Sequence, residues 1–226
     1  VDVRTAEMRI LYEELLKDDD PAVRQFAIRG LGRIIGVQDV EYLRLVQPHL
    51  DDSDIDVQAS TITSLILANK EPYVTEAEQR LRTLLSTDNA DYRRLGLEVI
   101  GSLKRVERIQ DIMPFLDDPS DEVRLQATQA ILALWKPKMP KDMYDLVLSR
   151  INAFMDDRVG RVRIADLSVL ALIDVDDSKR ALIRALGDPS PRVRDVAVSS
   201  LVKIGKSVEK LLERIATHDR GLNGKM

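Results

Sequence analysis

Cysteine is absent from this chain of 226 residues, and histidine occurs only twice, as His49 and His218. Without cysteine the chain has no disulfide, no thiolate metal site and no cysteine nucleophile, and nothing indicates an oxidising compartment. Neither histidine has a suitable catalytic partner near it in the sequence, and the sequence contains no phosphate-binding, zinc-protease or EF-hand motif. We therefore predict a protein that is not an enzyme, with no catalytic residue, no cofactor and no metal ligand.

Aromatic residues, long apolar runs and an excess of positive charge are also missing. Aromatics make up 4% of a chain that is 44% hydrophobic, which favours helices packed through aliphatic side chains and an all-α fold. No apolar run approaches the roughly 18 residues needed to cross a bilayer, and no signal peptide is visible. We expect a soluble cytoplasmic segment that does not itself insert into a membrane. The net charge of -4 gives no general attraction to nucleic acid.

What the sequence does contain is one pattern repeated along its length, around an anchor residue that is usually followed by arginine. The anchors are Val23, Val57, Tyr92, Val123, Val162 and Val193. Their intervals range from 31 residues (Tyr92 to Val123) to 39 residues (Val123 to Val162). A loose period of this size with two helices per unit is typical of an α-solenoid, in which neighbouring units stack.

The anchors and the residues four and eight after them have the spacing of one buried face of the second helix, so we expect all three columns in the core. Seven residues before the anchor we expect the buried last turn of a first helix, at Leu16, Leu50, Leu85, Leu116, Met155 and Leu186. Four residues after the anchor, small side chains let a partner helix approach, at Ala27, Thr61, Gly96, Ala127 and Ala197, with Asp166 as the exception. Eight residues after it are Leu31, Leu65, Ile100, Ile131, Leu170 and Leu201.

The turn between the two helices is rich in Asp, Asn, Ser and Pro, which end one helix and cap the next. We expect N-caps at Asp20, Asp54, Asn89, Ser120 and Ser190, with Asp157 as the substitute where Val159 breaks the pattern. The first helices are predicted near 5–16, 39–50, 75–85, 107–116, 141–155 and 176–186. A capping box is expected at Thr75–Glu78.

The stretches DDDPAVRQFAIRGLGRI, LDDPSDEVRLQATQAIL and LGDPSPRVRDVAVSSLV resemble HEAT repeats, in the short form found in bacterial HEAT-like proteins. The resemblance covers nearly the whole chain and implies a right-handed α-α superhelix of about six helix pairs with a C-terminal helix. We predict one domain, 1–226, with repeats near 1–36, 37–69, 70–104, 105–136, 137–174 and 175–205 and a terminal helix at 206–218.

The arginines that follow the anchors form a column, made of Arg24, Arg93, Arg124, Arg163 and Arg194, with Gln58 in the second copy. Such a column could track phosphates. Two observations favour a structural ladder instead: each arginine lies near a carboxylate of its turn, and the exposed helix face carries few other cations. Asp166 lies in a core column and must be paired if it is buried, so we expect an ion pair with Arg163, Arg124 or Arg194.

The resemblance also implies that the second helices line a concave surface. In the last three copies this surface would carry aliphatic residues where polar ones are expected. We predict a partner-binding groove for a protein or peptide at Leu125, Gln129, Leu132, Ile164, Ser168 and Val202. The alternative is that curvature of the solenoid or the Trp135–Lys141 connector covers these side chains.

The leading functional hypothesis is a non-catalytic protein-interaction scaffold that forms a module of a larger polypeptide, with neighbouring domains capping its ends. The architecture resembles the HEAT segment of bacterial ADP/ATP-translocase-like membrane proteins, which would make it a regulatory cytoplasmic part of a nucleotide transporter. A second alternative is a bilin lyase-like HEAT enzyme, although Trp135 is the only tryptophan available to a chromophore pocket.

Overall fold

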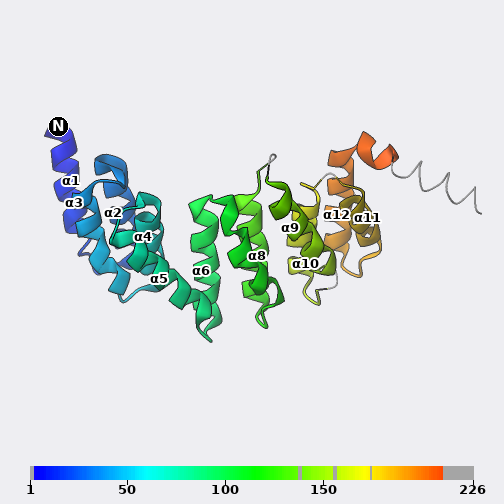
Figure 1. The fold of residues 1–226 in the computed structure, drawn as a ribbon, viewed down its shortest axis with the longest axis horizontal. Helices are drawn as coiled ribbons and strands as arrows, with labels where there is room; N and C mark the ends of the chain where they lie inside the picture. The colour runs from blue at the N-terminus through cyan, green and yellow to red at the C-terminus, as the bar shows by residue number, and fades with distance from the viewer. Residues whose placement is uncertain (1–2, 137–138, 155–156, 174, 211–226) are drawn as a thin grey trace, which may run out of the picture. The chain divides into compact units, whose positions relative to one another are not determined.

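A computed structural model shows helices separated by the short turns that the sequence predicts (Figure 1). It describes residues 3–136, 139–154, 157–173 and 175–210, and among them no residue is in a β-strand. The chain forms two compact units, Val1–Arg105 and Val106–Met226. Within the described residues, no helix has the length and apolar character that a membrane span requires.

The first unit consists of three successive helix pairs. Its helices are α1 (Val3–Leu15), α2 (Pro21–Leu31), the π-helical turn η1 (Gly32–Gly36), α3 (Val40–Val46), the 3-10 turn η2 (Gln47–Asp51), α4 (Ile55–Ala68), α5 (Tyr73–Ser86) and α6 (Ala90–Leu103). Helix α4 packs against both α2 and α6. It is therefore the central second helix of this unit.

The second unit repeats the arrangement, with 3-10 turns at the ends of two of its first helices. Its elements are η3 (Val106–Arg108), α7 (Ile109–Ile112), η4 (Met113–Asp117), α8 (Asp121–Leu134), α9 (Lys141–Phe154), α10 (Gly160–Leu170), α11 (Asp176–Arg184), η5 (Ala185–Gly187) and α12 (Pro191–Ile204). Helix α10 packs against both α8 and α12. The helix that follows α12 is described for residues 206–210, and the rest of the predicted terminal helix lies outside the described residues.

The small-residue column is fully confirmed as core, because all six residues four positions after the anchors are buried. Gly96 shows why small side chains are needed there. A Cβ at Gly96 would lie 2.8 Å from Cδ2 of Leu85, so α5 and α6 approach closely only because this position lacks a side chain.

Five predictions of burial are wrong: Leu186 and Tyr92 are exposed, and Val23, Leu85 and Leu201 are half-buried. Leu186 is 41% exposed in the 3-10 turn η5, where Ala185 takes the buried place instead. Tyr92, the one anchor that is not valine, is 38% exposed. The phenol ring is too large for the space that a valine fills in the other copies. Met155, in the same column as Leu186, lies outside the described residues.

The helix caps divide into two kinds. The Asp20, Asp54 and Asn89 side chains each accept a hydrogen bond from a backbone N–H of the first helical turn, as predicted. Ser120 and Ser190 have the extended backbone of an N-cap, but their hydroxyls make no capping hydrogen bond. The prediction was wrong for these two hydroxyls, although the aspartate two residues earlier accepts the serine N–H in each turn, as it does for the N–H of Asp20 and Asp54.

The predicted capping box at Thr75–Glu78 does not form. Helix α5 begins at Tyr73, so Thr75 lies inside the first turn, where its hydroxyl donates to Oε1 of Glu71 at 2.9 Å. Thr75 therefore cannot occupy the position before the helix that a capping box requires.

We predict that Leu116→Ala lowers the free energy of unfolding by about 2 to 5 kcal/mol, as expected for truncation of a buried leucine. Leu116 is 2% exposed in η4. Leu186→Ala is the matched control, because Leu186 occupies the same column and is 41% exposed in η5. Urea unfolding followed by circular dichroism would measure both. Equal losses for the two variants would contradict the burial described here.

Candidate functional site

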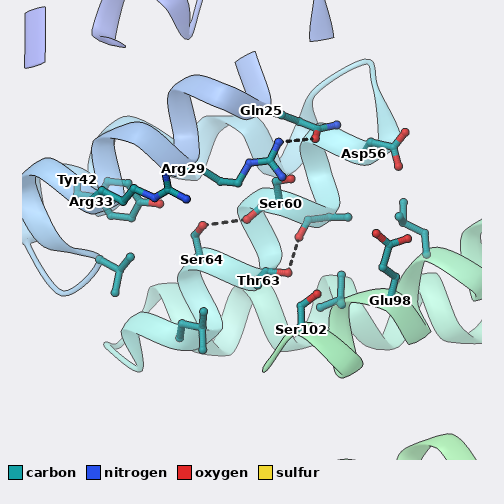
Figure 2. A pocket seen from close by; sticks show the side chains of 16 residues that line it. Gln25, Arg29, Arg33, Tyr42, Asp56, Ser60, Thr63, Ser64, Glu98 and Ser102 are labelled. Atoms are coloured by element: carbon teal, nitrogen blue, oxygen red, sulfur yellow. Dashed lines mark hydrogen bonds between the residues drawn. The ribbon is translucent and has the colours of Figure 1, made fainter. Parts of the chain in front are cut away.

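A cavity of about 570 Å³ opens on the first unit, over helices α2, α4 and α6 (Figure 2). Helix α4 lies between the other two and lines the cavity with small side chains, Ala59, Ser60, Thr63 and Ser64. The hollow exists because these side chains are short, whereas the walls on either side carry longer ones. Its volume falls within the range of roughly 300 to 1,000 Å³ that is usual for ligand sites.

The end of α2 is shaped by a glycine. Gly32 lines the cavity beside Tyr42, whose side chain is buried and whose hydroxyl donates to the carbonyl of Ile28 at 3.2 Å. A Cβ at Gly32 would lie 3.0 Å from Val37 and 3.3 Å from the Tyr42 hydroxyl. The missing side chain thus leaves room for the tyrosine at this end of the cavity.

Charges of opposite sign line opposite sides of the cavity. Figure 2 shows Arg29 and Arg33 on the α2 side and Glu98 on the α6 side, with Asp56 near the start of α4. Glu98 is compensated locally, because its carboxylate lies 3.3 Å from the Arg94 guanidinium. Arg29 makes one long hydrogen bond, at 3.3 Å to Oε1 of Gln25, and Arg33 contacts no acceptor among the described residues. The cations therefore retain more free hydrogen-bond donors than local acceptors can use.

The hydroxyl groups of α4 already donate within their own helix. Thr63 donates to the Ala59 carbonyl and Ser64 to the Ser60 carbonyl, each at 2.9 Å. Their oxygen lone pairs remain able to accept a hydrogen bond. Apolar contact area is supplied beside them by Leu67, Leu95 and Val99. The cavity thus combines acceptors, apolar area and unpaired cations.

Sequence reasoning missed this cavity because it weighed large aliphatic side chains on the second helices and not small ones. Five lining residues, Gln25, Arg29, Ala59, Thr63 and Glu98, occupy positions two or six residues after the anchors. The available signal was the run of small residues on α4 between the charged positions of α2 and α6.

The six residues of the predicted groove all belong to the second unit. Leu125, Gln129 and Leu132 lie on α8, Ile164 and Ser168 on α10, and Val202 on α12. Val202 is 74% exposed and Gln129 is exposed, whereas the other four are half-buried. A partner site on these residues stays a prediction.

The arginine column lies at the start of the second helices, where each side chain binds the turn before it. Each donates to the backbone carbonyl six residues earlier, at 2.6 to 2.9 Å: Arg24 to Asp18, Gln58 to Asp52, Arg93 to Thr87, Arg124 to Asp118, Arg163 to Asp157 and Arg194 to Asp188. The glutamine of the second copy therefore reproduces this contact without a charge.

Three of these arginines also form ion pairs with the aspartate of the following turn. The pairs are Arg24 with Asp52 at 2.6 and 2.9 Å, Arg124 with Asp157 at 2.6 and 3.2 Å, and Arg163 with Asp188 at 2.7 and 2.8 Å. We call them the ladder pairs. Both partners of each pair are nearly buried, and each aspartate also accepts the backbone N–H two residues later.

These hydrogen bonds outweigh the cost of burying the carboxylates. Burial alone would raise the pKa of Asp52, but hydrogen bonds from Arg24 and from the Asp54 N–H lower it to about 2. The Arg163 side chain likewise lowers the pKa of Asp188. A carboxylate with a depressed pKa contributes stability above its unfolded pKa and loses it as the pH falls through the folded value. The ladder pairs therefore stabilise the fold at neutral pH.

Between the second and third copies, both partners of the ladder pair are replaced by uncharged residues. Gln58 stands where an arginine stands in the other copies, and Thr87 stands where the other turns have aspartate. Removing one partner of a buried ion pair leaves an uncompensated charge, whereas replacing both avoids that cost. The paired change explains how the sequence tolerates Gln58 within the column.

The histidines and possible metal ligands were the remaining candidates for a chemical site. Nδ1 of His49 lies 3.2 Å from Oδ2 of Asp52, which places this histidine beside a ladder pair. His218 lies outside the described residues. No group of three or more His, Cys, Asp or Glu side chains that could hold a metal ion occurs in the part of the chain that is described.

Asp166 does not form the ion pair that the sequence predicts. It is fully buried on α10, and its Oδ1 lies 3.0 Å from the Thr128 hydroxyl, while Oδ2 has no hydrogen-bond partner among the described residues. Arg124 and Arg163 are already bound to Asp157 and Asp188, so neither is available. Burial raises the pKa of Asp166 to about 8, and the Thr128 hydrogen bond only partly opposes this.

Two family profiles match parts of the sequence. One, described as HEAT repeats, matches residues 148–222, and another, described as HEAT repeat, matches residues 11–38. No curated protein matches the sequence at a significant level.

Solved structures match almost the full length of the chain. An engineered protein from a structural genomics consortium has a TM-score of 0.54 at 14% identity and covers 89% of this chain and 97% of its own. A designed armadillo repeat protein has a TM-score of 0.51 at 20% identity, with 88% and 100% covered. A second designed armadillo repeat protein, in complex with the peptide (KR)4, has a TM-score of 0.52 at 19% identity, with 88% and 100% covered. These similarities show an all-α superhelical repeat fold.

We predict that Arg124→Gln lowers the free energy of unfolding by about 3 kcal/mol, because it leaves Asp157 buried without its cation. Glutamine can keep the contact with the turn carbonyl, as Gln58 does, so this substitution isolates the ion pair. Arg161→Gln is the control, since Arg161 pairs with Asp121 and Glu122 at the surface. Exposed pairs contribute about 0 to 1 kcal/mol. If the ladder pair contributed no more than a surface pair, urea unfolding would show the same loss of unfolding free energy for Arg124→Gln and Arg161→Gln.

We also predict that the stability of the wild-type chain falls between about pH 4 and pH 8, and that Asp166→Asn removes this fall. The raised pKa means that the folded state keeps a proton that the unfolded state releases, so rising pH favours unfolding by up to about 1.4 kcal/mol per pH unit. Urea unfolding at several pH values would measure the slope. Asp195→Asn, on an exposed position of α12, should keep the wild-type slope. If the unfolding free energy depended on pH in the same way for wild type and Asp166→Asn, the pH dependence would not come from Asp166.

Proposed function

Because the chain is an α-solenoid of HEAT repeats, we propose that it is a non-catalytic interaction scaffold that holds a peptide or protein segment in the cavity on α2, α4 and α6. The fold itself is that of protein-interaction modules in general. The observation that supports the location is the cavity of about 570 Å³, which three successive second helices line.

The residues that line the cavity are better suited to binding a peptide than to catalysing a reaction. A peptide backbone offers N–H donors to the hydroxyl oxygens of Ser60, Thr63 and Ser64, and its side chains can contact Leu67 and Val99. The designed armadillo protein that binds (KR)4 supports this use of the fold. Shared polar and apolar contacts of this kind provide binding without a nucleophile or a positioned base.

The wider setting is part of the same proposal. We propose that the chain is a module of a larger multidomain protein in the cytoplasm, where neighbouring domains cover its ends. A transporter-linked regulatory role would be a special case of this arrangement. A phycocyanin lyase complex from a Nostoc species has a TM-score of 0.41, which gives the lyase alternative no support.

Peptide display on the immobilised chain tests the proposal, followed by titration of the selected peptides against two matched variants. Thr63→Phe should fill the cavity and weaken binding by about tenfold or more, which corresponds to about 1.4 kcal/mol. Thr83→Phe is the control, because Thr83 makes the same hydrogen bond to the carbonyl four residues earlier but is exposed on α5. Both variants should keep the wild-type unfolding midpoint.

A third variant, Leu125→Asp, separates the cavity from the groove predicted on the second unit. Binding that survives Leu125→Asp and is lost with Thr63→Phe places the peptide in the first unit. The reverse result would move the site to α8, and peptides that bind all variants equally would contradict a peptide site at either place.

A further inference from the structure

The acidic and basic side chains that line the cavity differ in how many partners they have within the protein. Glu98 is paired with Arg94, and Asp56 lies in the first turn of α4, where the positive end of the helix dipole favours an acid. Arg29 and Arg33 lie at the ends of α2 and η1, where the dipole favours a cation but supplies no acceptor for a guanidinium. Unused hydrogen-bonding capacity therefore lies on the basic side.

The two arginines also repel each other. They are four residues apart on successive turns and both line the cavity, an arrangement in which like charges destabilise a helix slightly. Neither forms an ion pair with a described residue, unlike the ladder arginines Arg24, Arg124 and Arg163. A carboxylate placed between the two guanidiniums would relieve the repulsion and accept hydrogen bonds from both.

The other lining residues define what surrounds that carboxylate. Leu67 is 39% exposed, a large apolar side chain open to an occupant, and Leu95 and Val99 lie nearby on α6. An acidic residue flanked by an apolar one thus matches both sides of the cavity. Nucleic acid matches poorly, because it carries a charge on every nucleotide and would bring phosphates against Asp56 and Glu98, whereas a single carboxylate can lie at the arginines alone.

Resting on the proposed function, we propose that the occupant of this cavity is an acidic peptide segment, with an Asp or Glu side chain bound by Arg29 and Arg33 and a neighbouring apolar side chain on Leu67 and Leu95. The net charge of the chain, -4, does not prevent this, because salt screens distant charges beyond about 8 Å at physiological ionic strength.

Three labelled nonapeptides that differ only in charge test the inference: (Ser-Glu-Leu)3, (Ser-Gln-Leu)3 and (Ser-Lys-Leu)3. Fluorescence anisotropy should show the Glu peptide binding about tenfold more tightly than the Gln peptide, with the Lys peptide weakest. The preference should shrink as salt is raised. The double variant Arg29→Gln and Arg33→Gln should bind the Glu and Gln peptides alike.

The control is the double variant Arg44→Gln and Arg82→Gln, which removes the same charge from exposed positions on α3 and α5 that do not line the cavity. It should keep the preference for the Glu peptide. Loss of the preference in this control would overturn the inference, because the field of the whole protein would then be responsible. Absence of binding by the Glu peptide would also overturn it.

The two proposals fail in different ways. If all three peptides bind with equal affinity, or the Lys peptide binds best, and Thr63→Phe still weakens them, the cavity binds peptides without selecting acids. If displayed peptides bind Thr63→Phe and Leu125→Asp as tightly as wild type, the proposed function itself fails.

Discussion

At three of the second helices, a nearly buried guanidinium ties its own turn to the next one. Arg163 illustrates the constraint, because it donates to the carbonyl of its own turn at Asp157 and to both carboxylate oxygens of Asp188 in the following turn. Asp188 in turn accepts the Ser190 N–H before α12. Desolvating two charges is costly, and only this full set of hydrogen bonds makes the pair favourable. Since its donors are committed in this way, Arg163 is not available to a phosphate.

The ladder pairs also explain why the exposed faces of the second helices can carry different residues in different repeats. The turns fix where each second helix begins, and buried aliphatic side chains fix how neighbouring helices pack. The exposed side chains of α2, α4 and α6 then carry little of the stability. Small residues on α4 can leave a cavity, and Arg29 and Arg33 can remain unpaired, without loss of the fold. Asp166 is the opposite case, a buried carboxylate without a cation, and its raised pKa makes stability depend on pH.

Predictions from local spacing succeeded where the answer depends on a single helix. Ala27, Gly96 and Asp166 are buried, as the helical spacing of their column along the second helices predicts. Predictions about termini and partners were less reliable. Leu186 is exposed because its neighbour Ala185 takes the buried place, and Asp166 lacks an ion pair because the nearby arginines bind other aspartates. Spacing cannot show which of several acceptors a long side chain will reach.

The sequence by itself determined the helices, the turns, the core columns and the position of the arginines, because each follows from hydrogen bonding and periodicity within one repeat. Only the tertiary structure decided that Arg124 pairs with Asp157, and that the first unit has a cavity beside Arg29 and Arg33. Both depend on distances between side chains of different repeats. The empty volume over α4 is what remains after side chains from three separate helices have packed, and no single repeat specifies it.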